Sequence, residues 1–206
     1  MTSLVAPHQT VVDVVFPLRG RSLPREHAQA LQQALCAQLP WLATDAVAAI
    51  HPVKVVSGSD EVALLSQRAR LLLRVEAHRL DELMALAGLD LVVAGHDLHL
   101  DAAHWRELLP LATLYAYKVA APGMDEAAFM ASVDRELADL AIAGERVCGK
   151  RQHLVVSGRV LDTFSLMLHA LAPQPSLRLQ QHGLGPHRLL GCGVFVPHKS
   201  AAAVWQ

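Results

Sequence analysis

The sequence predicts an α+β fold in which a β-α-β-β-α-β pattern occurs twice along the chain. Short runs rich in valine and leucine indicate strands, and longer segments with apolar residues at helical spacing indicate amphipathic helices. Glycine or proline marks many of the breaks between these elements. The length of 206 residues allows one domain or two of about 100 residues each, so the choice rests on the repeated pattern.

The first copy of the pattern starts with a valine-rich strand. The helix after it begins at Pro24, and Leu31 and Leu35 recur at helical spacing before Pro40 ends it. The expected elements are a strand at 10–16, this helix, strands at 47–53 and 69–75, a helix at 78–87 and a strand or hairpin at 89–100.

The second copy repeats the order with a longer first helix, in which Phe129, Val133 and Leu137 are expected to point inward. Its elements are a strand at 111–119, a helix at 125–142, strands at 152–156 and 160–169, a short helix at 175–182 and a last strand at 192–196. Two copies imply two tandem ferredoxin-like (RRM-like) domains, residues 1–104 and 105–206. A sheet face or an inter-domain cleft in this topology can bind single-stranded RNA, but the fold alone does not assign a function.

Charge is unevenly distributed along the chain. The formal net charge is −1, which argues against a protein coated with nucleic acid over its whole surface. Residues 146–206 nevertheless contain seven Lys or Arg and one Asp, a net charge of +6. An anionic partner is therefore expected to bind this C-terminal third and part of the first third, because a nearly neutral protein can still concentrate positive potential in one patch.

The three cysteines, Cys36, Cys148 and Cys192, lie far apart in the sequence and form no Cys-x-x-Cys motif. Neither a disulfide framework nor a zinc site is indicated, so no cofactor is expected and a cytoplasmic protein is the plain interpretation. The sequence shows no secretory signal and no apolar run of about 18 residues, so no membrane association is expected.

The segment 183–197 contains two Gly-x-Gly pairs around a basic turn. Glycine tolerates positive φ and presents its N–H without a side chain, so the segment is expected to bind phosphate. A dinucleotide fingerprint would need a strand before the glycines and a helix after them, and a P-loop would need Gly-Lys-Ser/Thr; neither is present. A tight structural turn before a last strand is the alternative. The expected RNA-binding residues of this region are Arg178, Gly183, Gly185, His187, Arg188, Gly191 and Gly193.

Arginines suggest two more anion-binding surfaces. Alternation in the strand at 69–75 places Arg68, Arg70 and Arg74 on one face, which could contact an RNA backbone or could simply be solvated. Arg21 and Arg25 precede the first helix and are candidates for stabilising a transition-state phosphate.

Several motifs resemble one protein family. They are the segments 12–20, Leu23-Pro24 with His27, Ile50-His51-Pro52, 67–71, Leu86-Ala87-Gly88, Thr113-Leu114-Tyr115-Ala116, 176–180 and the glycine-rich end. With them the chain resembles the CRISPR-associated repeat-RNA-processing endoribonucleases, the sixth Cas family, and in particular their short variant from Myxococcus-type type I systems. The resemblance spans nearly the whole chain. It implies tandem ferredoxin-like domains that cut CRISPR repeat RNA without metal, leaving a 2′,3′-cyclic phosphate and a 5′-hydroxyl.

The resemblance also indicates which side chains carry out the reaction. Attack of a 2′-hydroxyl on its own phosphate needs a base for that proton, an acid for the leaving 5′ oxygen and donors for the phosphorane charge. In this family a histidine in or just after the first helix fills the acid or base role, and His27 and His51 both match such a position. The alternatives are a solvated first-turn residue for His27 and a packed strand-end residue for His51.

One departure from the family pattern concerns the phenolic partner. Close relatives usually carry Tyr two and five residues after the helix histidine, where this chain has Gln29 and Gln32. Tyr115 or Tyr117 is then the candidate phenol. The expected partners are CRISPR repeat RNA and other CRISPR effector subunits. The rival functions are a non-catalytic RNA-binding subunit of an effector complex and a ferredoxin-like regulatory protein that binds a small molecule.

Overall fold

The computed structural model describes residues 9–56, 58–59 and 61–198, and the chain divides into two compact units, Met1–Leu108 and Leu109–Gln206. The boundary falls after Leu108 rather than after His104. The reason is that β8 (His104–Glu107) pairs with β1 (Val11–Gly20) and so extends the sheet of the first unit.

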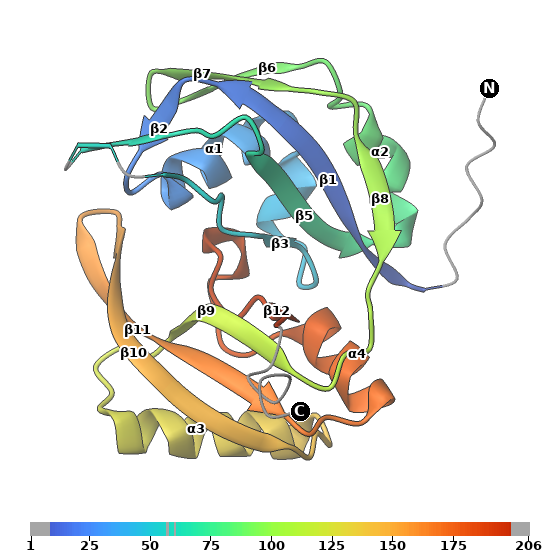
Figure 1. The fold of residues 1–206 in the computed structure, drawn as a ribbon, viewed down its shortest axis with the longest axis vertical. Coiled ribbons are helices and arrows are strands. Elements are labelled where there is room, and N and C mark those ends of the chain that lie inside the picture. The colour runs from blue at the N-terminus through green and yellow to red at the C-terminus, as the bar shows by residue number, and fades with distance from the viewer. Residues whose placement is uncertain (1–8, 57, 60, 199–206) are drawn as a thin grey trace, which may run out of the picture. The chain divides into compact units, whose positions relative to one another are not determined.

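The first unit is an antiparallel sheet in the order β3-β5-β1-β7-β6 (Figure 1). Strand β1 pairs with β5 along one edge and shares its other edge between β8 and β7. The remaining elements are β2 (Ser22–Pro24), α1 (Ala28–Gln38), η1 (Pro40–Ala43), β3 (Ala49–Ile50), β4 (Val62–Leu64), β5 (Arg70–Glu76), η2 (Ala77–Arg79), α2 (Leu80–Met84), β6 (Asp90–Val93) and β7 (His96–Leu100).

The core of the first unit follows the predicted periodicities. Leu31 and Leu35 of α1 are buried at a spacing of four residues, which places both on one helix face. Val12, Val14 and Phe16 alternate along β1 and are fully or almost fully buried. This packing fixes α1 against the sheet and therefore fixes the residue that precedes the helix, His27.

The second unit has the sheet order β10-β11-β9-β12, with α3 lying across one face in Figure 1. Its elements are β9 (Leu114–Ala120), α3 (Glu126–Asp139), β10 (Glu145–Val156), β11 (Arg159–His169), α4 (Pro173–His182), η3 (Arg188–Leu190) and β12 (Val196–Pro197). In both units the strand after the first helix lies at an edge of the sheet, β3 in the first and β10 in the second. Next to it come the third strand of the pattern (β5, β11), the first (β1, β9) and the fourth (β7, β12). This shared order confirms the predicted tandem ferredoxin-like fold.

The expected inward face of α3 is observed. Phe129, Val133 and Leu137 are buried against sheet residues that include Leu166 and Leu168. The helix starts where the Asp125 side chain caps it: Oδ1 accepts a hydrogen bond of 2.8 Å from the N–H of Ala128.

Four expected elements differ clearly in extent. The strand expected at 152–156 is the twelve-residue β10, which already begins at Glu145. The strand expected at 47–53 is only β3, and the helix expected at 78–87 divides into η2 and α2 before Gly88, whose φ of +86° ends it. The strand expected at 192–196 shrinks to β12, because η3 and the turns around its glycines occupy the residues before it.

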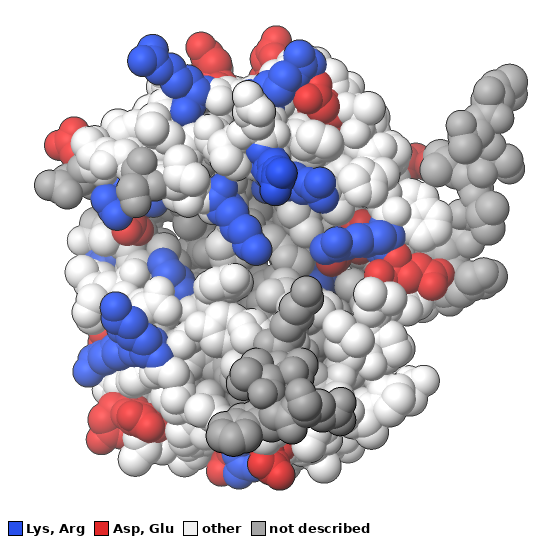
Figure 2. Space-filling view, viewed as in Figure 1, with Lys and Arg blue, Asp and Glu red and all other residues white. Residues whose placement is uncertain are grey.

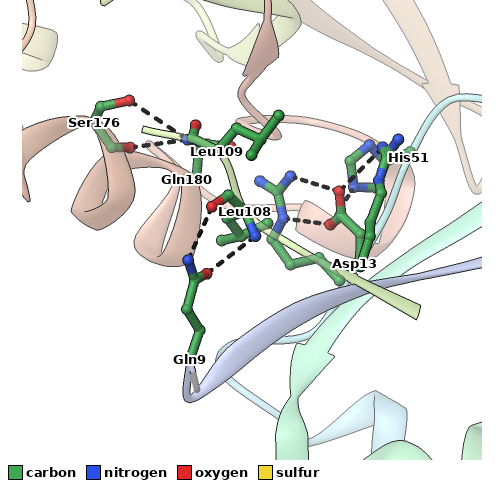
Figure 3. Close-up of polar contacts among 9 residues, drawn as sticks. Gln9, Asp13, His51, Leu108, Leu109, Ser176 and Gln180 are labelled. Carbon is green, nitrogen blue, oxygen red and sulfur yellow. Dashed lines mark hydrogen bonds and ion pairs between the residues drawn. The ribbon is translucent and has the colours of Figure 1, made fainter. Parts of the chain in front are cut away.

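Two polar residues of α4 hold the start of the second unit. Ser176 Oγ donates to the Leu111 carbonyl at 2.6 Å. Gln180 Nε2 donates to the Leu109 carbonyl at 2.8 Å (Figure 3). Both side chains are buried and lie one helical turn apart. The 176–180 motif, one of the strongest points of the family resemblance, therefore has a structural role in fixing residues 109–111.

Among the described residues, no helix combines the length and apolar character needed to cross a lipid bilayer.

Candidate functional site

His27 stands at the N-terminal end of α1 as its N-cap residue and is half-buried. Its Nδ1 lies 2.9 Å from the carbonyl oxygen of Pro24. A carbonyl oxygen can only accept, so Nδ1 carries the hydrogen and, in the neutral ring, Nε2 carries the lone pair. This tautomer makes Nε2 the atom that can accept a proton.

A small strand pair sets the position of Pro24. Strand β2 pairs with β4, where Pro24 is opposite Val62, and the N–H of Arg25 donates to the Glu61 carbonyl at 2.9 Å. The segment that carries the acceptor for His27 is thus held at a short antiparallel ladder before the helix begins. Sequence reasoning missed this ladder, since its strands are each three residues long.

The two candidate arginines are both exposed near this histidine in the sequence. The Arg25 guanidinium donates to the Ser59 carbonyl at 3.0 Å, which ties it to the loop before β4. Arg21 lies between β1 and β2, and its carbonyl accepts from the N–H of Leu65 at 3.1 Å. Both guanidinium groups remain at the surface, where an RNA phosphate can reach them.

The structure places His51 differently from the sequence expectation. Its side chain is only 5% exposed, and Nε2 lies 3.3 Å from Oδ1 of Asp13. Burial disfavours the charged ring and lowers the His51 pKa, despite the hydrogen bond to Asp13, which acts in the opposite direction. His51 is therefore a packed neutral histidine of the core, which corrects its assignment as a catalytic candidate.

Arg74 also departs from its expected place. It is fully buried, and its Nε donates to Asp13 Oδ1 at 2.8 Å. We call Asp13, His51 and Arg74 the buried ionic cluster; the exposed Arg106 approaches Asp13 from the surface at 3.4 Å, and Figure 3 shows the contacts of Asp13 with its partners. Burial alone would raise the pKa of Asp13, but the Arg74 guanidinium and the His51 ring hold it well below its usual range.

This cluster corrects the idea that Arg74 shares an outer face with Arg68 and Arg70. One signal could have shown it, because Asp13 interrupts a run of buried valines and a buried carboxylate requires a partner. Asp13 is paired in register with Arg74 across β1 and β5. Arg68 and Arg70 are exposed, and within the described part of the chain neither has an ion-pair partner.

The glycine-rich segment is packed rather than open. All four glycine N–H groups donate to protein acceptors, and the contacts are Gly183 to Leu179 O at 2.8 Å, Gly185 to Glu136 Oε2 at 2.7 Å, Gly191 to Arg188 O at 3.1 Å and Gly193 to Lys118 O at 2.7 Å. These N–H groups are thus engaged by protein acceptors in this structure, and phosphate binding by the segment stays a prediction. The alternative of a tight structural turn describes the segment better.

The glycines are needed for close backbone approach within the protein. Gly193 has a φ of +66°, and a Cβ built on it would lie 2.0 Å from the Leu184 carbonyl oxygen. A Cβ on Gly183 would lie 2.4 Å from the Gly193 carbonyl oxygen. The two Gly-x-Gly pairs therefore pack directly on each other.

Of the basic residues in the C-terminal segment, the two arginines contact protein groups and His187 is exposed. Arg188 is buried and donates to the His182 carbonyl, and Arg178 donates to the Leu140 carbonyl at 2.7 Å at the C-terminal end of α3. Both arginines thus satisfy backbone acceptors, which corrects the expectation that they are free to bind RNA. His187 is exposed and adopts a left-handed conformation with a φ of +70°.

Tyr115 is half-buried on β9 in the second unit, whereas His27 belongs to the first. Its ring meets the Tyr117 ring edge-on at a centroid distance of 5.0 Å and lies 5.4 Å from the His198 ring. Its role as a phenolic acid stays a prediction.

Exposed cations also mark the second unit. Figure 2 shows Lys and Arg side chains beside the β10–β11 hairpin. The exposed cations of this hairpin are Arg146, Lys150, Arg151 and Arg159. Of these, Arg146 pairs with Asp134 and Arg151 lies 3.0 Å from Asp162. In the described ranges, no group of three His, Cys, Asp or Glu side chains is arranged to bind a metal ion.

Known proteins resemble this chain in sequence and in fold. The family model described as Cas6 Crispr matches residues 12–200. The CRISPR-associated endonuclease Cas6 of Myxococcus xanthus strain DK1622 is 34% identical over 194 residues, covering 94% of this chain and 84% of that protein.

Two solved structures have the same fold. One, described as CRISPR associated protein Cas6, has a TM-score of 0.69 at 9% identity and covers 92% of this chain and 100% of its own. The other, described as an RAMP protein binding different RNA substrates, has a TM-score of 0.64 at 10% identity and covers 91% of this chain and 98% of its own. Since the family model spans most of the sequence and the Myxococcus relative matches nearly all of it, this chain belongs to the Cas6 family of CRISPR-associated proteins.

Proposed function

We propose that the protein is an endoribonuclease that cuts CRISPR repeat RNA without a metal ion, leaving a 2′,3′-cyclic phosphate and a 5′-hydroxyl. The observation that carries the proposal is the contact between His27 Nδ1 and the Pro24 carbonyl, which selects the tautomer with a basic Nε2. Membership of the Cas6 family and the endonuclease name of the Myxococcus relative support the substrate and the reaction class.

The proposed step is a transesterification within the RNA. His27 Nε2 accepts the proton of the 2′-hydroxyl as O2′ forms a bond to the adjacent phosphorus. The bond from phosphorus to O5′ breaks, and the leaving oxygen takes a proton from a general acid. Arg21 and Arg25 would stabilise the extra negative charge on the phosphorane, because a guanidinium offers paired donors to phosphate oxygens.

RNA binding would rely on the exposed cations. Arg68 and Arg70 of the first unit and Lys150 and Arg159 of the second are all exposed and lack an ion-pair partner in the described part of the chain. Such side chains can neutralise phosphates and release counterions. Other subunits of a CRISPR effector complex stay predicted partners.

The test uses purified protein and its cognate repeat RNA in excess EDTA. Cleavage once per repeat is expected, with a 5′-hydroxyl on the downstream product and resistance of the upstream 3′ end to polyadenylation. A 2′-deoxy nucleotide on the 5′ side of the cut should abolish cleavage, since it removes the nucleophile. Normal cleavage of that deoxy substrate would overturn the mechanism, and RNA binding without any cleavage would favour the non-catalytic subunit.

A further inference from the structure

One face of the second sheet carries aromatic rings rather than a helix. Leu114 and Ala116 of β9 point into the core that α3 covers. Successive side chains of a strand point to opposite faces, so Tyr115 lies on the other face, opposite Met167 of β11 and Val196 of β12. This face presents a ring in the middle of the sheet.

Two β-bulges occur side by side on this sheet. Between the pairs Phe164–Val119 and Leu166–Ala116, strand β9 contributes Tyr117 and Lys118 opposite the single residue Ser165. Strand β10 contributes Gly149 and Lys150 opposite the same residue between its pairs Cys148–Leu166 and Arg151–Phe164. A bulge bends its strand and changes the direction of the side chains that it carries.

The bulge on β9 is held in place. Gln152 Nε2 donates to the Tyr117 carbonyl at 2.9 Å, and Lys118 Nζ donates to the His153 carbonyl at 3.4 Å. A Cβ on Gly149 would lie 2.4 Å from Ser165 Oγ, so a larger residue there would have to displace the Ser165 side chain. The geometry around Tyr117 is therefore built into the sheet.

The aromatic rings themselves form a supported group. Tyr117 is 45% exposed, and its ring packs edge-on against Tyr115 at 5.0 Å and an interplanar angle of 84°. Tyr115 is in turn 5.4 Å from the ring of His198. A large ring that is held on one side by another ring and exposed on the other can accept a flat partner at little conformational cost.

Cations accompany the rings. Lys118 and Lys150 occupy the two bulges, and Lys150 is exposed. An exposed ring on a sheet whose bulges also carry lysines matches the chemistry of an unpaired nucleotide, which offers a base to stack and a phosphate to neutralise.

We propose that Tyr117, supported by Tyr115 and His198, is a stacking platform for one unpaired base of the bound RNA. The proposal rests on the proposed function, in that the ligand is RNA, and it adds a binding site for one single-stranded nucleotide at Tyr117. Stacking needs the ring of Tyr117 and not its hydroxyl.

The experiment measures binding of repeat RNA by fluorescence anisotropy for the full-length protein and three variants. Tyr117→Ala should weaken binding about 5- to 100-fold, the usual loss for one stacked base, and Tyr117→Phe should bind within about twofold of the wild type. Val160→Ala, which removes an aliphatic side chain of the same unit that is 66% exposed, is the control and should have no effect. Thermal unfolding of each variant checks that the fold is intact.

A second measurement locates the base. Photocrosslinking with 5-iodouridine scanned through the unpaired positions of the repeat should give one position that crosslinks to the peptide containing Tyr117. Equal affinities of the wild type and Tyr117→Ala, or an equal loss in Tyr117→Phe and Tyr117→Ala, would overturn the platform while leaving the nuclease proposal intact. A wild-type protein without RNA affinity would instead reject the proposed function and the platform with it.

Discussion

The Nδ1 atom of His27 lies 2.9 Å from the carbonyl oxygen of Pro24, which fixes the tautomer of a histidine at the start of α1. The backbone carbonyl of the preceding turn thereby helps to orient the ring. Replacing it should remove the proposed base and leave the surface cations unchanged. His27→Ala is therefore expected to lower the single-turnover cleavage rate by about 10²- to 10⁴-fold, with little change in repeat affinity.

The control for this variant is His78→Ala, since the His78 side chain is 60% exposed in the same unit. It should cut at the wild-type rate. Quench-flow or manual sampling under single-turnover conditions gives the rate, and anisotropy gives the affinity. Wild-type cleavage by His27→Ala would remove this histidine from the mechanism.

The buried ionic cluster predicts a large loss of stability when its carboxylate is neutralised. Asp13→Asn leaves the fully buried Arg74 guanidinium without its counter-charge. Breaking such a pair costs about 3–5 kcal/mol, and the midpoint of urea unfolding should fall accordingly. Asp97→Asn, at an exposed position of β7, is the matched control and should change the midpoint little.

The same cluster makes stability depend on pH. The His51 pKa is lowered by burial, so the unfolded chain binds a proton below about pH 6.5 that the folded chain resists. The Asp13 pKa is also lowered, so its contribution is present above about pH 4 and is lost as the pH falls further. Both groups therefore make the folded state less stable in acid.

The contribution of His51 can be isolated by substitution. Urea unfolding at pH 7.5, 6.0 and 5.0 should show a shallower loss of stability for His51→Gln than for the wild type, even though the variant is less stable at pH 7.5. Parallel pH profiles for the two proteins would mean that folding leaves the pKa of His51 unchanged.

The glycine-rich end predicts a clear difference between two glycines with positive φ. Gly193→Ala brings a Cβ to 2.0 Å from the Leu184 carbonyl oxygen, so the segment must shift and a loss above about 3 kcal/mol is expected. Gly95→Ala has nothing within 4 Å and should cost only about 1–2 kcal/mol, the strain of the left-handed conformation. A Gly193→Ala protein that unfolds like Gly95→Ala would return the segment to the role of an open, ligand-facing loop.

The fold and part of the candidate site could be predicted from the sequence. Periodicity located α1 and α3, because their buried leucines and aromatic residues recur at helical spacing and face one core each. It failed for Arg74, since alternation assigns a side chain to a face but does not say whether that face is covered. It also failed for the glycines, since residue type shows that backbone approaches closely but not what it approaches.

Two features of the candidate site depend on contacts between distant segments. The position of the Pro24 carbonyl, the acceptor for His27, depends on the pairing of β2 with β4. The paired residues of these two strands are at least 38 positions apart in the sequence. The bulges around Ser165 arise from three strands and leave no pattern in any one of them. Local sequence patterns therefore do not predict these contacts.

The last prediction concerns Arg68 and Arg70, the exposed cations of the first unit. Three other candidate arginines, Arg74, Arg178 and Arg188, instead donate hydrogen bonds to protein groups. Neutralising Arg70 removes one exposed positive charge that has no ion-pair partner in the described part of the first unit. Arg70→Gln should weaken repeat binding by about 1–3 kcal/mol and reduce the slope of log K against log salt by roughly one, because one fewer counterion is released. Arg135→Gln on the outer side of α3 is the matched control, and it should leave the slope unchanged. Equal slopes for Arg70→Gln and the wild type across a salt titration would move the RNA away from β5.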